Sequence, residues 1–349
     1  MLDKKCVKTI GRTAWLDDTL WMAHSGSGME TMFYGKKAVV TMLGDSTAHG
    51  DTDNQARFAI YLNDTLVADC MMDQEQKEIV VLDAPEEKQC VLRIIKLTES
   101  AMSTIGIKDI QITCQGTPEP TPDKPYYIEF VGDSITCGYG VEDEDPEHHF
   151  VTSTENVTKA YAYKTAKALD ADYSMVSLSG YGIISGYTET GESKITEQVL
   201  PDYYDKLGFS HGSYMGKKPT DVAWDFSGRQ PDLVVLNLGT NDDSYTLDHS
   251  DRQEEYAHAY TEFIKVLRKS NPSAMLLCVL GIMGDRLYPY VEKAVSAYKA
   301  ETGDDNIRTM KFDVQKEEDG YVADWHPTVA THDKAAAKLV GMIKEMKSL

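Results

Sequence analysis

Two Gly-Asp-Ser triplets stand out as residues that could perform chemistry. One lies in "FVGDSITCGYG" (130–140), where a hydrophobic run ends in Ser134 and a glycine-rich turn. The other lies in "MLGDSTAHG" (42–50) and contains Ser46. A serine hydroxyl becomes a nucleophile when a base takes its proton, and histidine, with a pKa of about 6.5, is a suitable base at neutral pH. The rest of the chain must show which serine, if either, has such a base.

Three further polar blocks follow hydrophobic runs in the second half of the chain: "SLSGYG" (177–182), "LGTND" (238–242) and "ADWHPT" (323–328). His326 is the candidate base. Because Pro327 and a long helical pattern follow it, we expect His326 near a helix amino terminus, where the positive end of the dipole favours the neutral imidazole. An acyl-transfer intermediate also needs donors for its oxyanion. The amide of Asn241 and the N–H groups of Gly182 and Ser134 are the candidates.

The elements that would position these blocks alternate between strand and helix. Strand candidates are "YYIEFVG", "YSMVSLS", "DLVVLNLG", "AMLLCVLG" and "IRTMKFDV". Apolar residues at helical spacing fall between and after them: Tyr256, Tyr260, Phe263, Ile264 and Leu267, then Leu339, Met342, Ile343 and Met346. This alternation predicts an α/β domain with a parallel sheet between two helical layers, whose active site lies at the carboxyl ends of the strands.

Residues 1–115 have a different pattern. Short apolar runs such as "ARFAIYLND" and "QCVLRIIKL" alternate with turn residues, which predicts an all-β sandwich. The segment 116–125, "GTPEPTPDKP", has four prolines and is interpreted as a spacer, so 126–349 form the second domain. Ser46 falls in the sandwich and is followed by turn residues. We therefore interpret Ser46 as structural and Ser134 as the nucleophile.

Composition limits the partners. The net charge is -21 and the pI is about 4.8, so nucleic acids and anionic membranes would repel the chain. A neutral substrate fits better. Six scattered cysteines without a CxxC pair indicate reduced thiols rather than a disulfide framework or a zinc site. The amino terminus has no apolar secretory stretch, so we expect a cytoplasmic protein, or a secreted one if a leader has been removed. The oligomeric state stays open.

The four blocks, in this order, resemble those of the SGNH, or GDSL-type, hydrolases. With the opening "GRTAW" and "SGSGMETMFYG", the chain is similar to carbohydrate esterase family 2 over nearly its whole length. The resemblance implies a jelly-roll-like sandwich joined to an SGNH domain. It also implies removal of O-acetyl groups from plant β-glycans such as xylan and glucomannan, without a metal or other cofactor. It carries the nucleophile to Ser134, the base to His326 and the oxyanion donors to Gly182 and Asn241.

One position departs from the wider SGNH pattern. An aspartate is usual three residues before the histidine, but Ala323 occupies that position and Asp324 follows it. Either the Asp324 side chain or a backbone carbonyl orients His326, and we favour the side chain. Trp325, beside His326, is either a core residue or a platform on which a sugar stacks. Tyr181 is the second candidate for contact with the substrate.

Other reactive residues receive simpler interpretations. Cys137, three residues after Ser134, is interpreted as a small buried hydrophobe. Glu147, His148 and His149 are interpreted as a solvated acidic loop rather than a metal site. The chain has neither the GxSxG elbow at Ser134 nor a dinucleotide-binding glycine fingerprint.

The sequence thus predicts a serine esterase that deacetylates acetylated xylan- or mannan-type oligosaccharides through an acyl-enzyme. The alternative enzymatic function is that of a lipid esterase or thioesterase, because the same catalytic residues could catalyse those reactions. A non-catalytic glycan-binding protein is the alternative outside them. The resemblance further suggests the 6-O-position of hexopyranosyl units, and the lack of a leader suggests imported oligosaccharides as substrate.

Overall fold

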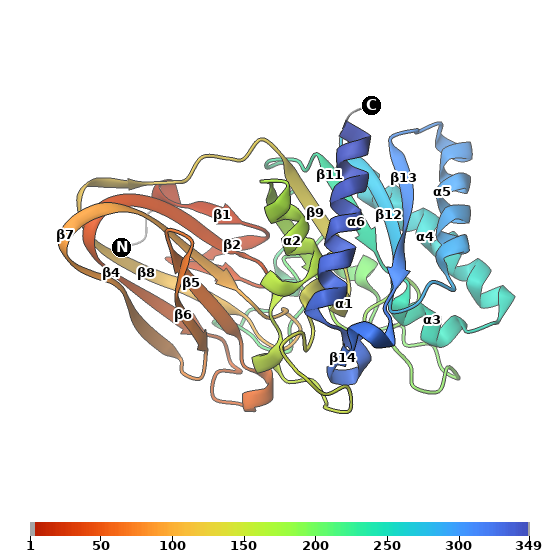
Figure 1. Ribbon diagram of the computed structural model, residues 1–349, viewed down its shortest axis with the longest axis horizontal. Coiled ribbons are helices and arrows are strands. Elements are labelled where there is room, and N and C mark those ends of the chain that lie inside the picture. The colour runs from red at the N-terminus through yellow and green to blue at the C-terminus, as the bar shows by residue number, and fades with distance from the viewer. Residues whose placement is uncertain (1–3, 348–349) are drawn as a thin grey trace.

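The computed structural model describes residues 4–347 and has two parts (Figure 1). The amino-terminal part is one curled antiparallel sheet with the strand order β2-β3-β8-β4-β7-β5-β6, and β1 pairs with β4. Its strands are β1 (Lys8–Ile10), β2 (Thr13–Leu16), β3 (Thr19–Met22), β4 (Gly28–Gly44), β5 (Arg57–Leu62), β6 (Thr65–Met71), β7 (Gln76–Lys96) and β8 (Ile105–Glu119). The predicted all-β domain is confirmed.

This sheet curls because its three longest strands bend. Both ladders of β4, with β7 and with β8, change register between Gly35 and Lys37. Such irregularities kink a strand and increase its twist. A Cβ at Gly35 would lie 2.6 Å from the carbonyl oxygen of Thr113, so the bend requires glycine. The curled sheet encloses an apolar core that includes Phe33, Phe58 and Ile94.

The spacer begins later than the sequence predicted. Residues 116–119 belong to β8, whereas we expected all of 116–125 to lie outside the strands. The β4–β8 ladder is irregular here, since it changes register between the pairs Met32–Glu119 and Tyr34–Gln115. Pro118 lies in this irregular stretch, which suits a residue that cannot donate a ladder hydrogen bond.

The second part is an α/β domain around a five-stranded sheet with the order β10-β9-β11-β12-β13. All four neighbouring pairs are parallel. The strands are β9 (Tyr127–Gly132), β10 (Asp172–Ser177), β11 (Leu233–Asn237), β12 (Met275–Ile282) and β13 (Ile307–Val314). A separate hairpin pairs β14 (Tyr321–Val322) with β15 (His326–Pro327). The predicted parallel sheet is confirmed.

Helices cover both faces of this sheet (Figure 1). They are α1 (Ser134–Cys137), α2 (Tyr161–Ala168), α3 (Thr240–Thr246), α4 (Ser250–Ser270), α5 (Tyr288–Thr302) and α6 (Val329–Lys347). One core contains residues of α4 and α5, and the other contains residues of α2 and α6. The apolar residues predicted for two helices lie in these cores, as Tyr260 and Leu339 illustrate.

Short 3-10 helices connect these elements: η1 (Lys4–Cys6), η2 (Thr52–Asn54), η3 (Thr152–Thr154), η4 (Val157–Lys159), η5 (Leu200–Tyr203), η6 (Pro219–Asp221), η7 (Glu317–Asp319) and η8 (Ala323–Trp325). Among the described residues, no helix has the length and apolar character needed to cross a bilayer.

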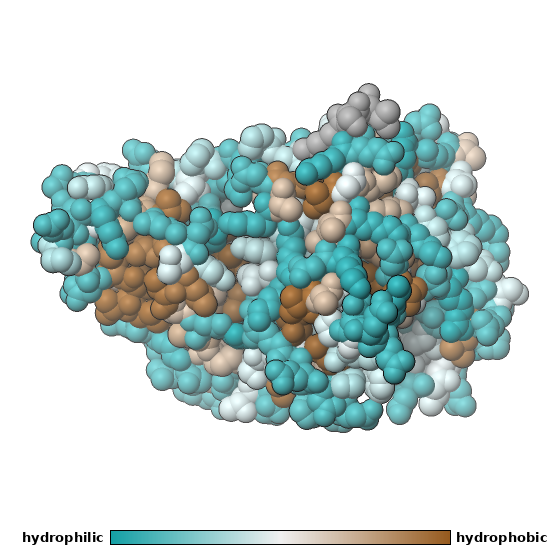
Figure 2. Space-filling model, in the orientation of Figure 1, coloured by the Kyte–Doolittle hydropathy of each residue, from teal (hydrophilic) through white to brown (hydrophobic). Residues whose placement is uncertain are grey.

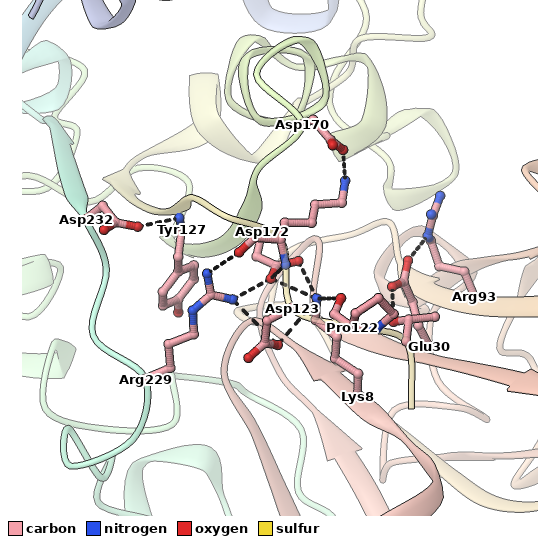
Figure 3. Close-up of polar contacts among 12 residues, drawn as sticks. Lys8, Glu30, Arg93, Pro122, Asp123, Tyr127, Asp170, Asp172, Arg229 and Asp232 are labelled. Atoms are coloured by element: carbon pink, nitrogen blue, oxygen red, sulfur yellow. Dashed lines mark hydrogen bonds and ion pairs between the residues drawn. The ribbon is translucent and has the colours of Figure 1, made fainter. Parts of the chain in front are cut away.

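Ion pairs join the two domains near the amino ends of the parallel strands (Figure 3). The ammonium of Lys8, on β1, donates to the carboxylate of Asp172 at the start of β10, at 2.6 Å, and Arg229 binds the same carboxylate. Lys8 also donates to the carbonyl of Pro122 in the spacer. These residues adjoin a cavity of about 650 Å³ whose lining includes neither Ser134 nor His326. This junction is therefore separate from the predicted active site.

A buried arginine fastens the domains together more deeply. Arg12, in the "GRTAW" motif, is fully buried and lies 3.4 Å from the carboxylate of Glu129 on β9. It also donates to the carbonyls of Tyr204 and Lys206. Its guanidinium stacks over the ring of Tyr204, 4.7 Å from the ring centroid. Arg12 thus carries a charge from the amino-terminal domain into the core of the α/β domain, where Glu129 balances it.

The visible surface differs between the two domains. Figure 2 shows an apolar region over the amino-terminal sheet, while most of the remaining surface in this view is hydrophilic. Large exposed hydrophobic side chains of the amino-terminal domain include Tyr34, Leu66, Val67 and Val80. The hydrophilic remainder agrees with the large negative charge of the chain.

Arg12→Met is expected to lower the free energy of unfolding by about 3–5 kcal/mol, because it leaves the Glu129 carboxylate buried and unpaired. Urea denaturation measures the change. Arg229→Met is the matched control, since its partly exposed ion pair should contribute only about 0–1 kcal/mol. The double variant Arg12→Met/Glu129→Gln should recover part of the loss. Equal losses in the two arginine variants would contradict the prediction.

Candidate active site

Ser134 begins α1 directly after β9, at the carboxyl edge of the parallel sheet. Asp133 caps this short helix, and its carboxylate accepts the N–H of Ile135 at 3.1 Å. Gly138 ends the helix with φ 81°, and a Cβ there would lie 2.7 Å from the carbonyl oxygen of Asn156. The first turn after the strand is therefore tightly constrained, which fixes where the Ser134 hydroxyl points.

The imidazole of His326 lies against this hydroxyl. Its Nε2 is 2.9 Å from Ser134 Oγ. Its Nδ1 faces two main-chain carbonyl oxygens, of Asp324 at 3.1 Å and of Ala323 at 3.2 Å. Because carbonyl oxygens only accept, Nδ1 carries the proton in the neutral ring and Nε2 is free to accept one from Ser134. Ser134 and His326 are thus arranged as a nucleophile and its base.

The Asp324 carboxylate points elsewhere, which corrects the expectation that this side chain orients His326. It accepts the hydroxyl of Tyr139 at 2.8 Å and the N–H of Phe150 at 3.0 Å, and it lies 3.3 Å from Nδ1 of His149. The reason is the backbone: Asp324 has φ 51° and ψ 37°. This left-handed conformation turns the carbonyl toward the imidazole, so Asp324 contacts His326 through its main chain.

Tyr139 is a residue of this site that sequence reasoning missed. Its ring stacks on the imidazole of His326, with centroids 4.1 Å apart, and on Phe150 from 4.0 Å. Its hydroxyl is held by Asp324. The Asp324 side chain therefore acts on the imidazole through Tyr139. The only sequence signal was the position of Tyr139 in the glycine-rich turn after Ser134.

In the glycine block, residues 177–182, it is the main-chain N–H of Gly180, and not that of Gly182, that is free to bind an oxyanion. The Gly182 N–H donates to the carbonyl of Gln198 at 3.1 Å, which corrects its expected role as an oxyanion donor. Within residues 4–347, the N–H groups of Gly180 and Ser134 donate to no protein acceptor. Gly180 has φ 81°, a conformation that suits glycine. The strand register brings this loop beside the turn at Ser134, because Ser177 pairs with Gly132, but it does not by itself distinguish Gly180 from Gly182.

Gly182 has a structural role instead. A Cβ there would lie 2.1 Å from the carbonyl oxygen of Ser185 and 2.6 Å from the Asp242 carboxylate. That carboxylate accepts the N–H groups of Ile183, Ile184 and Ser185. Burial raises the pKa of Asp242 to about 6, against the effect of these hydrogen bonds. Asp242 thus ties the glycine block to the start of α3.

Asn241 lies beside Asp242 in α3 and is buried. Its Nδ2 donates to the carbonyl of Tyr181 at 2.8 Å. A side-chain amide has two N–H groups, so a second donor remains. The sequence-predicted Asn241 is thus anchored to the same loop that carries Gly180.

The two residues expected to contact substrate have different environments. The Tyr181 side chain is 4% exposed and packs against Tyr203 and Phe209, so it is a core residue, which corrects that expectation. Trp325 is 51% exposed and adjacent to His326. Of the two, only Trp325 presents a large aromatic surface to solvent.

The remaining reactive residues lie apart from catalysis. Ser46 Oγ accepts the N–H of Ser213 at 2.9 Å, as expected of a structural serine. Cys137 is buried, and burial raises the pKa of its thiol well above the ordinary value. His148 pairs with the carboxylates of Asp143 and Asp145. These contacts agree with a structural Ser46, a buried Cys137 and an exposed acidic loop at His148.

Burial governs the protonation of His326. Loss of solvation lowers the pKa of this imidazole to about 4, against the effect of the Asp324 and Ala323 carbonyls. The sequence had predicted a helix amino terminus as the cause. Instead, His326 lies in β15, and α6 begins only at Val329. The ring is consequently neutral, and able to accept a proton, across the neutral and mildly acidic range.

Both parts of the chain match known families. Residues 130–334 match the GDSL-like Lipase/Acylhydrolase family, and residues 9–122 match the domain described as Carbohydrate esterase 2 N-terminal. The chain therefore belongs to the GDSL-like lipase/acylhydrolase family, a class of ester hydrolases. Within that class it has the domain composition of the family 2 carbohydrate esterases, as the resemblance implied.

Characterised relatives agree with this placement. The chain is 29% identical to Cellulase/esterase CelE of Acetivibrio thermocellus over 92% of its own length, but it spans only 37% of that protein. It is 27% identical to an acetylxylan esterase / glucomannan deacetylase of Cellvibrio japonicus, covering 97% of this chain and 88% of the relative. A family two carbohydrate esterase from Clostridium thermocellum, solved with cellohexaose, superposes with a TM-score of 0.83 at 27% identity, covering 98% of this chain and 99% of that one.

The acid limb of kcat/KM should have its midpoint near pH 4, because the free enzyme works while His326 is neutral and burial lowers its pKa to about 4. Activity is retained as the pH falls from 7 to about 5 and is lost as the imidazole takes up a proton. Initial rates of ester hydrolysis between about pH 3 and pH 8 measure this limb. A midpoint at about 6.5, the ordinary histidine value, would contradict it.

Asp324→Asn should lower kcat by less than about tenfold, because the main-chain carbonyls still hold His326 Nδ1 and the new amide oxygen can accept from Phe150 and Tyr139. Steady-state kinetics on one acetylated substrate, with circular dichroism to check the fold, measure the effect. A loss of about 10⁴ would show that the carboxylate itself orients the imidazole.

Proposed function

We propose that this protein is a serine esterase that removes O-acetyl groups from acetylated plant β-glycan oligosaccharides of the xylan or mannan type. The observation that carries the proposal is the 2.9 Å contact between Ser134 Oγ and His326 Nε2 at the edge of the parallel sheet. A relative that is named for acetylxylan and glucomannan deacetylation supports the choice of substrate.

The first half-reaction forms an acetyl-enzyme. Ser134 Oγ attacks the carbonyl carbon of the acetyl group while its proton passes to His326 Nε2. The imidazolium then gives that proton to the departing sugar oxygen. The carbonyls of Ala323 and Asp324 stabilise the charged ring, because they accept from Nδ1 throughout.

The oxyanion is stabilised by three donors from three consecutive loops. They are the N–H of Ser134, the N–H of Gly180 and the free N–H of the Asn241 amide. Gly180 takes the role for which the sequence suggested Gly182. Because these donors are fixed before the reaction, they stabilise the developing charge without a reorganisation cost.

The second half-reaction releases acetate. A water molecule gives a proton to His326 Nε2 and attacks the acetyl carbon, and the tetrahedral intermediate collapses to return the proton to Ser134 Oγ. The same donors stabilise both tetrahedral intermediates. Trp325 is the proposed surface on which a pyranose ring stacks, since it is exposed beside the base.

The description of the domains belongs to the same proposal. We assign the chain up to Glu119 to a jelly-roll-like domain, 120–125 to the linker and 126–349 to the catalytic domain, so that the boundary expected at 115 moves to the end of β8. The two family matches, to 9–122 and 130–334, support this division.

Ser134→Ala should lower kcat by about 10⁴-fold or more, as removal of an activated nucleophile does, while Ser46→Ala should stay within about twofold of the wild type. The measurement is acetate release from acetylated xylo- and manno-oligosaccharides, with NMR to identify the acetyl position that is lost. The two serines occur in the same triplet, which makes Ser46 the matched control. Comparable losses in both variants, or wild-type protein that releases no acetate from any of these substrates, would overturn the proposal.

A further inference from the structure

Two buried glutamates lie beneath the site and have no part in the mechanism above. Glu99 follows β7 and belongs to the amino-terminal domain, whereas Glu155 follows η3 in the α/β domain. Both residues are fully buried. A ligand atom of each carboxyl group and the sulfur of Cys137 lie within 4.8 Å of one another. We call Glu99 and Glu155 the buried carboxyl pair.

Hydrogen bonds connect the buried carboxyl pair to the loop 178–182 that follows β10 and carries Gly180, which we call the oxyanion loop. Glu155 Oε2 accepts the N–H of Glu99 at 2.8 Å. Glu99 Oε2 accepts the N–H of Ser179 at 2.9 Å, and the next residue is Gly180. The other oxygen of each carboxyl, Oε1, has no hydrogen-bond partner. Both carboxyls thus have one oxygen engaged in positioning and one that is buried and unused.

The charges around the pair do not balance if both carboxyls are ionised. Lys96, at the end of β7, is fully buried, and its ammonium donates to the carbonyls of Thr98 and Glu99. It is a single positive charge beside two carboxyls. The other titratable groups that influence this region include the buried His24, whose pKa burial lowers to about 3, and the acidic or neutral groups Asp45, Asp133, Cys137, Tyr139 and Tyr181. Two carboxylates would therefore leave a net negative charge away from water, which is costly.

The ionisation of the two carboxyls agrees with this balance. Burial, and then the charge of Glu99, raises the pKa of Glu155 well above its usual range. Burial also raises the pKa of Glu99. Two carboxyls in one buried site cannot both ionise readily, so one proton remains with the pair.

We propose that the buried carboxyl pair holds one shared proton in the working enzyme, and that Glu99 then positions the oxyanion donor of Gly180 through Ser179. This rests on the proposed esterase function and adds Glu99 and Glu155 as positioning residues. The amino-terminal domain thereby contributes to the catalytic geometry without contacting the reacting atoms.

The proposal predicts that kcat falls at high pH. It assigns this alkaline limb of the pH profile to loss of the proton from the buried carboxyl pair. When the pH rises, the pair loses its proton and the two carboxylates repel each other. Glu99 then withdraws from Ser179, and Gly180 leaves its position. Because the oxyanion exists only beyond the ground state, kcat falls more than KM rises.

The experiment compares wild type, Glu155→Gln and Glu155→Ala in acetate release over a pH series. In Glu155→Gln the amide keeps an oxygen that accepts from the N–H of Glu99 and has no proton to lose. The alkaline limb of kcat for this variant should therefore move to higher pH or vanish. Alanine removes the acceptor, so kcat should fall by about tenfold or more with KM within about twofold. Glu155→Gln should retain most of the kcat that Glu155→Ala loses. Glu75→Gln, at an exposed glutamate, is the control that leaves the limb in place.

A readout independent of activity comes from infrared spectroscopy of the same variants. The spectrum of wild type minus that of Glu155→Gln at neutral pH should contain the C=O stretch of a protonated carboxyl, while any band of Asp133, whose pKa burial raises to about 7, cancels in the difference. This separates the two proposals, because the band does not depend on ester hydrolysis. If wild type releases no acetate but has the band, the proposed function fails and the protonated pair stands.

Three results would overturn the inference. One is the absence of the carboxyl band from the difference spectrum of wild type and Glu155→Gln. Another is an alkaline limb unchanged in Glu155→Gln, which would assign that limb to another group such as Lys96. The third is a stoichiometric metal ion in purified wild type that is lost in Glu155→Gln, because a cation would then balance the pair in place of the proton.

Discussion

The register of three parallel strands at Gly132 determines where the chemistry can occur. Gly132 ends β9 and is paired with Ser177 of β10 on one side and with Asn237 of β11 on the other. The loops that leave these three strands therefore start at the same level. A Cβ at Gly132 would lie 2.1 Å from Thr136 Oγ1, so the close return of the chain into α1 also depends on this residue. The serine, the oxyanion loop and the asparagine converge because their strands end together.

The base arrives by a different route and depends on local backbone conformation. His326 lies in a hairpin outside the five-stranded sheet, and the consecutive left-handed residues Asp324 and Trp325 precede it. This conformation directs two carbonyls at Nδ1 and leaves the Asp324 carboxylate for Tyr139. In the wider SGNH pattern an aspartate lies three residues before the histidine, whereas Asp324 lies two residues before His326. Here main-chain carbonyls, instead of an aspartate side chain, orient the imidazole. A main-chain acceptor fixes the tautomer without adding a charge, and burial then keeps the imidazole neutral.

The sequence predicted the features that depend on periodicity and strand ends. These include the parallel sheet, the all-β first domain and the convergence of Ser134 with His326. It did not separate Gly180 from Gly182, because two glycines two residues apart differ only in which N–H the folded loop leaves free. Whether Asp324 offers its carboxylate or its carbonyl depends on φ and ψ, which composition does not reveal. Tyr181 looked accessible for the same reason, since its direction is set by packing against residues distant in the chain.

Contacts between the domains were the least accessible to sequence reasoning, and one of them reaches the loop that carries Gly180. Arg12 and Glu129 are more than a hundred residues apart, and so are the partners of the Lys8–Asp172 pair. Glu99 belongs to the same group, because its carboxyl reaches Ser179 across the interface. All three contacts place charge where water is scarce, so each must be balanced by a partner or a proton. The contacts between the domains thus include one to the loop that carries Gly180, the proposed oxyanion donor.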